Sequence, residues 1–281
     1  MDGIIIVDKP KGWTSRDVVN KISKVLRIKK VGHTGTLDPL ATGVLVICTG
    51  KATKICELLT STEKTYEAEA VLGIETDTLD LEGKIIKEEN VHKKEEEIKK
   101  IIDSFPKKYM QEVPIYSAVK VDGRKLYEYA RENEKIVLPK KEVEIKKIAL
   151  KEILYEENKT KIKIECIVSK GTYIRSLVRD LAYSMNTVGT MTSLRRTKQG
   201  YFSLKDANTI EDIENNKYKL LTIEEVLPYK KIEVNDFLKN KIINGQKLEN
   251  RLHEPILFTY EGKAIALYKE DNDKIKPWKM F

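Results

Sequence analysis

The glycine-rich segment at residues 32–45 places the strongest constraint on how this chain folds. It reads Gly-His-Thr-Gly-Thr-Leu-Asp-Pro-Leu-Ala-Thr-Gly-Val-Leu, and its three glycines permit tight turns and close approach of the backbone to a ligand. Asp38 and Pro39 mark a bend inside it, although an Asp-Pro pair alone often does no more than open a turn. The apolar run at residues 44–48 is short enough to be a buried strand. The segment therefore predicts a loop that leads into a strand and can aim one carboxylate into a cleft.

Two common glycine motifs are absent from this region. A phosphate-binding loop requires Gly-x-x-x-x-Gly-Lys-Ser/Thr, but Gly50 and Lys51 are followed by Ala52, and the first glycine is missing. A dinucleotide-binding fingerprint requires three glycines in a strand-turn-helix unit, which Gly32 and Gly35 do not supply. The loop is therefore not predicted to hold a nucleotide cofactor.

Read as a whole, residues 32–45 closely resemble the central motif of the TruB-type tRNA pseudouridine synthases. The Lys-Gly-Thr-Tyr-Ile-Arg run that ends at Arg175 and the Lys-x-Tyr run that ends at Tyr66 resemble further motifs of this family, in the same order. The resemblance covers roughly residues 3–228 and is weaker beyond them. It implies that Asp38 is the catalytic residue.

The resemblance also gives roles to two residues that have ordinary alternatives. Tyr66 lies in a predicted strand and by itself would most often be a packing residue, but the family places a base-stacking tyrosine here. Arg175 by default would be an exposed helix arginine in a minor ion pair. The family instead places it against the catalytic carboxylate, which a planar guanidinium can hold bidentately and keep ionised.

Four further residues are candidates for substrate binding. In the family the residue matching His33 fills the space left by the flipped nucleotide, whereas a lone histidine in a turn is usually structural. Lys9 and Pro10 match a Lys-Pro-x-Gly motif beside the cleft and are expected to support its wall, although the spacing alone also suits a solvated turn. Leu194, in a Leu-Arg-Arg element, is expected to line the base pocket, or else to be an ordinary core leucine.

Residues 111–131 interleave lysine and arginine with tyrosine. This composition suits phosphate neutralisation and stacking on bases, although ordinary half-exposed helices share it. The order resembles the start of the family's mobile RNA-clamping insertion, which we place at about 112–141. Val113 stands where the family has the first of two prolines, so the local backbone is expected to differ there.

Hydrophobic periodicity predicts an alternation of strands and helices. Residues 3–8, 64–72, 140–154 and 159–169 read as strands. A helix capped by Thr14 or Ser15 precedes the glycine-rich loop, a charged amphipathic helix is predicted at 91–104, and another follows Arg175 to about residue 185. With the resemblance, this predicts an α+β fold in which a mixed, largely antiparallel sheet is flanked by helices.

The chain is expected to divide near Pro228. Residues 1–228 are predicted to form the catalytic domain, and residues 229–281 a short, β-rich, PUA-like RNA-binding domain that includes a hairpin at 255–268. A unit of about 50 residues could scarcely stabilise itself, so it should pack against the main body.

Composition and charge narrow the class of protein. A net charge of +8 and a pI near 9.0 permit an anionic partner such as tRNA, although lysine-rich composition alone identifies none. The three cysteines are scattered, and neither they nor His33, His92 and His253 have metal-ligand spacing. No signal peptide or long apolar run is present, so a cytoplasmic protein is expected.

The resemblance implies an isomerase that converts uridine 55 in the T loop of tRNA into pseudouridine without a cofactor or metal. Asp38 would attack C1′ or remove the 2′ proton, and both routes stay open. Tyr66 could also assist loss of the C5 proton. The alternative is a non-enzymatic tRNA folding chaperone. Guide-RNA-dependent relatives fit less well, because the sequence starts at the catalytic domain and retains the long insertion. We therefore expect a monomer without guide RNA or obligate protein partner.

Overall fold

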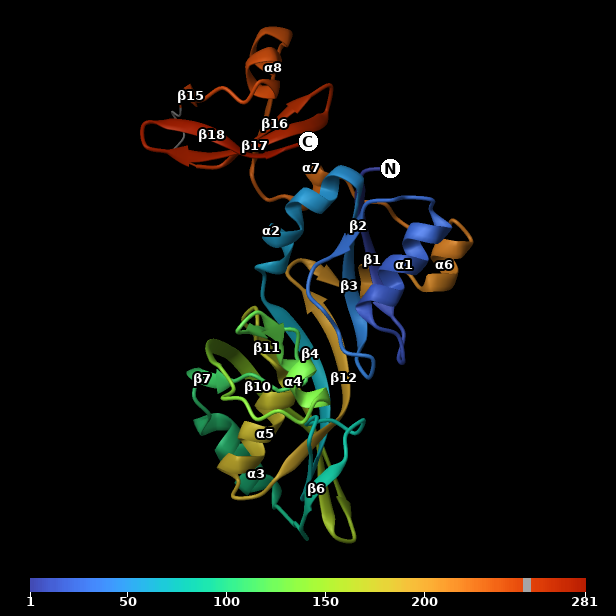
Figure 1. The fold of residues 1–281 in the computed structure, drawn as a ribbon, viewed down its shortest axis with the longest axis vertical. Helices are drawn as coiled ribbons and strands as arrows, with labels where there is room; N and C mark the ends of the chain where they lie inside the picture. The colour runs from blue at the N-terminus through green and yellow to red at the C-terminus, as the bar shows by residue number, and fades with distance from the viewer. Residues whose placement is uncertain (250–253) are drawn as a thin grey trace.

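The main sheet organises most of the chain (Figure 1). A computed structural model describes residues 1–249 and 254–281, so His253 lies outside the described part. The strands of the main sheet are β1 (Gly3–Lys9), β2 (Val31–His33), β3 (Thr42–Thr49), β4 (Lys64–Leu72), β7 (Lys108–Glu112), β10 (Lys140–Glu156), β11 (Lys159–Val168), β12 (Gly189–Gln199) and β13 (Phe202–Ser203). Their order is β1-β3-β12-β4-β11-β10-β7, with β2 beside β3 and β13 beside β12. Among the described strands of this sheet, only β3 and β12 pair in parallel, so the predicted mixed, largely antiparallel sheet is confirmed.

The parallel seam between β3 and β12 requires an unusually close approach. Gly43 has φ +101°, and a Cβ atom there would lie 2.2 Å from the carbonyl oxygen of Arg196. Only glycine fits such a position without strain. The third glycine of the predicted loop therefore serves strand packing.

The first helix starts where the sequence predicts. In α1 (Ser15–Val25), the Thr14 hydroxyl accepts a hydrogen bond from the Asp17 amide at 3.0 Å, and the Asp17 carboxylate accepts one from the Thr14 amide at 2.8 Å. This reciprocal capping satisfies two backbone donors that would otherwise have no partner. Val18 and Ile22 on the buried face then pack against β1 and β3.

Two helices cover one face of the central strands. Leu177 and Leu181 of α5 (Ile174–Ser184) share a core with Ile98 of α3 (Glu95–Ser104) and with apolar side chains of β4 and β11. Helix α3 starts at Glu95, later than predicted, because the Val91 backbone instead bonds to Asn158 and Thr160. In the described part of the chain, no helix is long and apolar enough to cross a membrane.

The remaining short elements connect these layers. They are the 3-10 helices η1 (Gly50–Ile55) and η2 (Leu204–Asp206), the helices α2 (Cys56–Thr60), α6 (Ile210–Glu214) and α7 (Ile223–Val226), and the hairpin of β5 (Ile74–Thr76) with β6 (Ile85–Glu88). The β5-β6 hairpin holds the acidic loop 77–83. That loop reaches the site described below.

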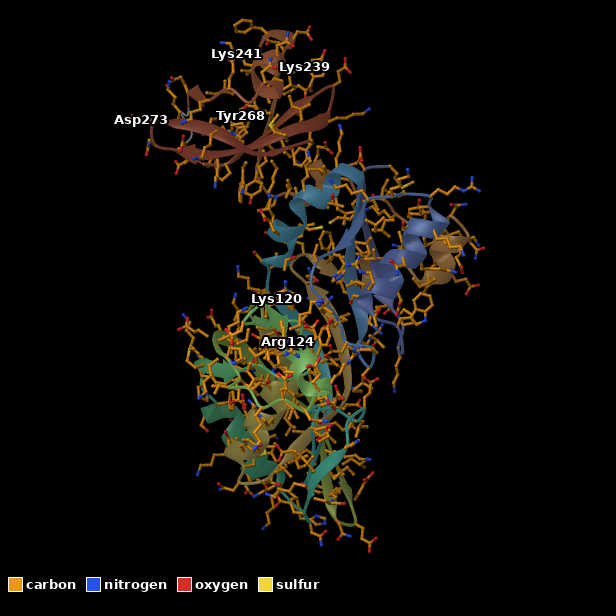
Figure 2. The ribbon with its side chains drawn as sticks, viewed as in Figure 1. Lys120, Arg124, Lys239, Lys241, Tyr268 and Asp273 are labelled. Atoms are coloured by element: carbon orange, nitrogen blue, oxygen red, sulfur yellow. The ribbon has the colours of Figure 1, made fainter. Side chains whose placement is uncertain are left out.

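The predicted insertion contains a small hairpin, β8 (Lys120–Val121) with β9 (Arg124–Lys125), followed by α4 (Leu126–Arg131). Figure 2 shows Lys120 and Arg124 on this unit. The Arg124 guanidinium lies 4.4 Å from the ring centroid of Tyr129, which is 8% exposed. The Tyr129 ring is therefore covered by the chain itself, whereas the sequence suggested that the tyrosines of this segment are available to bases.

A second sheet follows Pro228. Its strands are β14 (Lys230–Glu233), β15 (Leu248–Glu249), β16 (Ile256–Tyr260), β17 (Lys263–Asp271) and β18 (Lys274–Met280), in the order β14-β16-β17-β18-β15. Helix α8 (Asp236–Ile243) lies at the far side, where Figure 2 labels Lys239 and Lys241. Leu257 and Leu267 share a buried core with Ile4 of β1, so this sheet packs against the main body as predicted.

Candidate active site

A cavity of about 290 Å³ lies where the glycine-rich loop, β4, β12 and the start of α5 meet. Its lining comprises Gly35, Thr36, Leu37, Asp38, Thr60, Lys64, Tyr66, Tyr116, Ser117, Ala118, Lys170, Gly171, Thr172, Tyr173, Ile174, Arg175, Leu194 and Arg196. Four of the predicted site residues are thus brought together, although they are far apart in the sequence. Across residues 1–249 and 254–281, no group of three or more His, Cys, Asp and Glu side chains could hold a metal ion.

Ser15, the first residue of α1, anchors the loop that carries Asp38. The buried Ser15 hydroxyl accepts a hydrogen bond from the Leu37 amide at 2.8 Å and lies 3.1 Å from the Leu37 carbonyl oxygen. The Ala41 amide then donates to the Asp38 carbonyl at 3.0 Å and closes the turn. The backbone is fixed on both sides of Asp38, whose side chain stays 38% exposed. Its carboxylate is therefore held in place and open to the cavity.

Arg175 is the ion-pair partner of Asp38, with 3.0 Å between Nε and Oδ2. Its two terminal nitrogens also bond to the backbone, because Nη1 donates to the Thr78 carbonyl at 2.9 Å and Nη2 to the Tyr116 carbonyl at 3.0 Å. The contact with Asp38 thus involves Nε, whereas the sequence suggested a bidentate grip. Arg175 ties the acidic loop and the insertion to Asp38.

Asp80 is a second carboxylate at Arg175, and no sequence motif gave it a role. It is 3% exposed and lies 3.5 Å from Arg175 Nη1, on the far side from Asp38. The Thr78 hydroxyl donates to it at 2.6 Å and the Glu82 amide at 3.1 Å. Between these partners Leu79 has φ +64°, a left-handed conformation unusual for leucine. The acidic loop is shaped to present Asp80 to Arg175.

Tyr66 and Leu194 line the same cavity as Arg175. They stand on the neighbouring strands β4 and β12, where Tyr66 pairs with Arg196 and Leu194 pairs with Ala68. Tyr66 is 6% exposed, and its hydroxyl lies 3.5 Å from Arg196 Nη1. An aromatic ring and an apolar side chain thus line the cavity that also contains Asp38.

Arg196 and Lys64 also line the cavity, although the sequence motifs gave neither of them a role. Arg196 is fully buried and donates from Nε to the Val44 carbonyl at 2.7 Å and from Nη2 to the Gly35 carbonyl at 3.0 Å. Burial, reinforced by the charges of Arg196 and Lys170, lowers the pKa of Lys64 to about 8. Strand alternation could have revealed Arg196, because it lies two residues from Leu194 and thus on the same face.

Lys9, Pro10 and His33 do not line the cavity. The buried Lys9 ammonium donates to the Pro10 carbonyl at 2.9 Å and approaches that of Pro39 at 3.5 Å, next to Asp38. His33 ends β2, and its Nδ1 atom has no hydrogen-bond partner among the described residues. Burial, followed by the charges of Arg16 and Arg196, lowers the pKa of His33. Its imidazole is therefore neutral at physiological pH.

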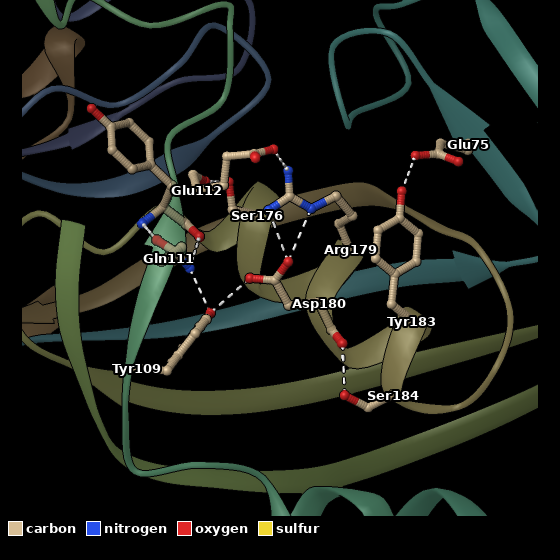
Figure 3. A network of polar contacts seen from close by, with 10 residues as sticks. Glu75, Tyr109, Gln111, Glu112, Ser176, Arg179, Asp180, Tyr183 and Ser184 are labelled. Carbon is tan, nitrogen blue, oxygen red and sulfur yellow. Dashed lines mark hydrogen bonds and ion pairs between the residues drawn. The ribbon is translucent and has the colours of Figure 1, made fainter. Parts of the chain in front are cut away.

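A polar network holds the start of α5 against β7 (Figure 3). The Gln111 side chain accepts from the Tyr173 amide at 2.8 Å and donates to the Tyr173 carbonyl at 3.2 Å. It also donates to the Tyr109 hydroxyl, which in turn donates to Asp180 at 2.9 Å. Because Tyr173 precedes Arg175 by two residues, this network fixes the backbone from which that guanidinium projects.

Comparison with known families identifies the class of protein that this geometry belongs to. A model of the N-terminal domain of TruB family pseudouridylate synthases matches residues 23–174, and a model of the tRNA pseudouridylate synthase B C-terminal domain matches residues 175–244. The chain is therefore a pseudouridylate synthase, an isomerase. Proteins named tRNA pseudouridine synthase B from Oceanobacillus iheyensis and Mesoplasma florum are 40% and 39% identical to it. The alignments cover 100% and 97% of this chain and 98% and 95% of the relatives. The chain belongs to the TruB family of tRNA pseudouridine synthases.

Solved structures share the fold at lower identity. An H/ACA RNP bound to a substrate RNA containing 2′-deoxyuridine is similar with a TM-score of 0.71 at 21% identity, and a Cbf5-Nop10-Gar1 complex with 0.71 at 22%. Both comparisons cover 99% of this chain and 84% of the other chain. The predicted α+β pseudouridine synthase fold with a β-rich C-terminal part is confirmed.

Proposed function

We propose that this enzyme converts uridine 55 in the T loop of tRNA into pseudouridine, with Asp38 as the catalytic group. The reaction breaks the N1–C1′ glycosidic bond, turns the uracil and rejoins it to C1′ through C5. No atoms or electrons are gained overall, so the chemistry requires no redox cofactor, nucleotide or metal. It does require one carboxylate at the ribose and a pocket that excludes water.

The Asp38–Arg175 ion pair inside the cavity carries this proposal. Asp38 attacks C1′ or removes the 2′ proton, and Arg175 holds its carboxylate in position through the 3.0 Å contact. Tyr66 stacks on the uracil and Leu194 supplies an apolar wall against water. A duplex-embedded base cannot reach such a cavity, so the nucleotide must be flipped out of its stack.

Recognition of the RNA involves parts outside the cavity. His33 fills the space that the flipped nucleotide leaves, while Lys9 and Pro10 support the loop that carries Asp38. The insertion at about 112–141 closes over the T loop, and the PUA-like region at 229–281 adds a second RNA contact beyond a catalytic domain at 1–228. The enzyme acts as a monomer in the cytoplasm, without guide RNA or protein partner.

The test is to incubate the purified protein with unmodified tRNA and to map pseudouridine by chemical labelling and primer extension. We expect one stop in the T loop, and no product with Asp38→Asn. A stop elsewhere would overturn the substrate position but not the enzyme class. If the wild-type protein accelerated tRNA folding and formed no pseudouridine, the chaperone alternative would replace this proposal.

A further inference from the structure

Arg196 is a buried charge without a carboxylate partner. It is 0% exposed, and its three hydrogen bonds go to the carbonyls of Val44 and Gly35 and to the Tyr66 hydroxyl. Among the described residues, no ion pair includes it. Burying a guanidinium is costly unless a negative charge compensates it. Each of its nitrogens donates once within the protein, so both terminal nitrogens keep a second N–H.

A second positively charged side chain, that of Lys64, lies near Arg196. The position that a Cβ atom of Gly35 would occupy lies 3.4 Å from Lys64 Cε and 3.6 Å from Arg196 Nη1. The Lys64 ammonium donates to the carbonyls of Thr60 and Thr62 at 3.0 and 2.9 Å, so it also lacks a carboxylate among the described residues. Both side chains line the cavity. Two positively charged side chains that have no carboxylate partner among the described residues therefore lie next to Gly35.

We propose that Arg196, assisted by Lys64, is a further catalytic residue that stabilises the uracil anion formed when the glycosidic bond breaks. This inference rests on the proposed function. Whether Asp38 attacks C1′ or removes the 2′ proton, the electron pair of the N1–C1′ bond passes to the uracil. The charge spreads over N1 and the two carbonyl oxygens, and the positive charge of Arg196 in the cavity lining attracts it.

Every bond that breaks in this step is matched by a bond that forms. The uracil anion turns and its C5 forms a bond to C1′, while the C1′–Asp38 ester or the 2′ proton transfer is reversed. C5 then loses its proton to a base, and N1 takes up a proton. The anion exists only between bond cleavage and rejoining. Fixed cations at that point lower the barrier without having to reorganise.

The test compares uridine with 5-fluorouridine at the target position of a T stem-loop RNA. Fluorine withdraws electrons and stabilises the uracil anion, so the RNA with 5-fluorouridine depends less on Arg196. Single-turnover loss of the starting nucleoside is measured after digestion. For Arg196→Lys we expect a fall of about 100-fold with uridine. The fall should narrow to roughly 10-fold with 5-fluorouridine, as anion stabilisation by the protein becomes less important.

Arg195→Lys is the matched control. It is the same substitution one residue earlier, on a side chain that pairs with Asp8 at 2.7 Å and is absent from the cavity lining. We expect rates close to wild type for both nucleosides. Tyr66→Phe tests an indirect effect. If Arg196 acts only by orienting the Tyr66 hydroxyl, Arg196→Lys will cause no further loss in that background, which contradicts the proposal.

An equal fall for uridine and 5-fluorouridine in a folded Arg196→Lys protein would overturn the inference. If the Arg196→Lys protein does not fold, the Lys64→Gln variant tests the inference in its place. We expect its single-turnover rate to fall by roughly 10-fold with uridine and by less with 5-fluorouridine. An equal loss for both nucleosides there would contradict the proposal as well. A wild-type protein that forms no pseudouridine in the T loop would remove the proposed function itself, which separates the two failures.

Discussion

The two arginines that line the cavity have opposite surroundings. Arg175 faces two carboxylates, Asp38 and Asp80, and also donates to the backbone carbonyls of Thr78 and Tyr116. Arg196 has only carbonyls and a phenol, although it is the more deeply buried of the two. A neutralised guanidinium is suited to hold another group in place, whereas an uncompensated one is suited to meet a negative charge that appears during the reaction.

The largest effect should follow from Arg175→Lys. A lysine keeps the charge but cannot contact Asp38, Thr78 and Tyr116 at once, since those contacts need three nitrogens of one planar group. We expect kcat to fall by about 100-fold, as for other small misplacements of a reacting group. Single-turnover kinetics on a T stem-loop RNA measure this, and filter binding should show nearly unchanged RNA affinity. A rate near that of wild type would mean that a positive charge at position 175 is enough for catalysis.

Asp80→Asn should have an intermediate effect. The amide keeps the shape of the side chain but removes the charge that faces Arg175 Nη1 at 3.5 Å. Losing a partner that orients a functional group from the next layer usually reduces activity by about 10-fold. The same kinetics test this, with Asp77→Asn on the same loop as control. An effect as large as that of Asp38→Asn would instead indicate that Asp80 takes part in the chemistry.

The pH dependence of activity should sharpen the comparison on the Arg196 side. Because burial lowers the pKa of Lys64 to about 8, the cavity loses one positive charge as pH rises through that value. We expect the single-turnover rate to fall above about pH 8 by several-fold. Lys64→Arg should move this fall to higher pH. Burial also lowers the pKa of Lys9 to about 8, so Lys9→Arg is the control. A shift caused by Lys9→Arg alone would assign the profile to Lys9.

Stability should change with pH in the opposite direction to activity. In the unfolded chain Lys64 binds its proton up to about pH 10.5, but in the folded protein only to about 8. Between these values the unfolded state binds more protons, so this group makes the free energy of unfolding increase with pH. Urea unfolding of wild type and Lys64→Met at about pH 8 and 10 measures it. Equal pH dependence in both proteins would contradict the lowered pKa.

The smallest effect is expected for Gln111→Ala. This change removes the hydrogen bonds that hold the Tyr173 backbone, while Arg175 keeps its other contacts. One buried hydrogen bond contributes about 1 kcal/mol, which corresponds to a roughly fivefold lower kcat if the loss falls on the transition state. Gln111→Glu, which keeps the acceptor for the Tyr173 amide, should lie between wild type and Gln111→Ala. If Gln111→Ala lowered the free energy of unfolding but left kcat unchanged, the hydrogen bonds of Gln111 would serve stability and not catalysis.

Much of the fold follows from local signals in the sequence. The strands at β1, β4 and β11 alternate or run apolar over their full lengths, and Thr14 with Asp17 specifies where α1 starts. The Asp38–Arg175 contact could be predicted from the sequence because each residue lies in a distinctive motif. The assignment of roles to them is still a proposal.

The features that sequence reasoning missed are made by segments that meet only in the folded chain. The Arg175 partners Thr78 and Tyr116 lie 97 and 59 residues away, so no spacing could reveal that they share the guanidinium with Asp38. Likewise, the absence of a counter-ion at Arg196 depends on what surrounds it in three dimensions. Strand alternation could place Arg196 on the cavity face, but could not show that it stays unpaired.

The insertion of β12 between β3 and β4 has a consequence for the life of the enzyme during its own synthesis. Arg196 contacts Val44 across 152 residues of chain, so its part of the cavity lining is missing until the ribosome has released the segment after α5. A nascent polypeptide that already contains Asp38 and Arg175 would still lack that part of the cavity. Catalytic competence therefore comes late in translation, when the last strand of the cavity enters the sheet.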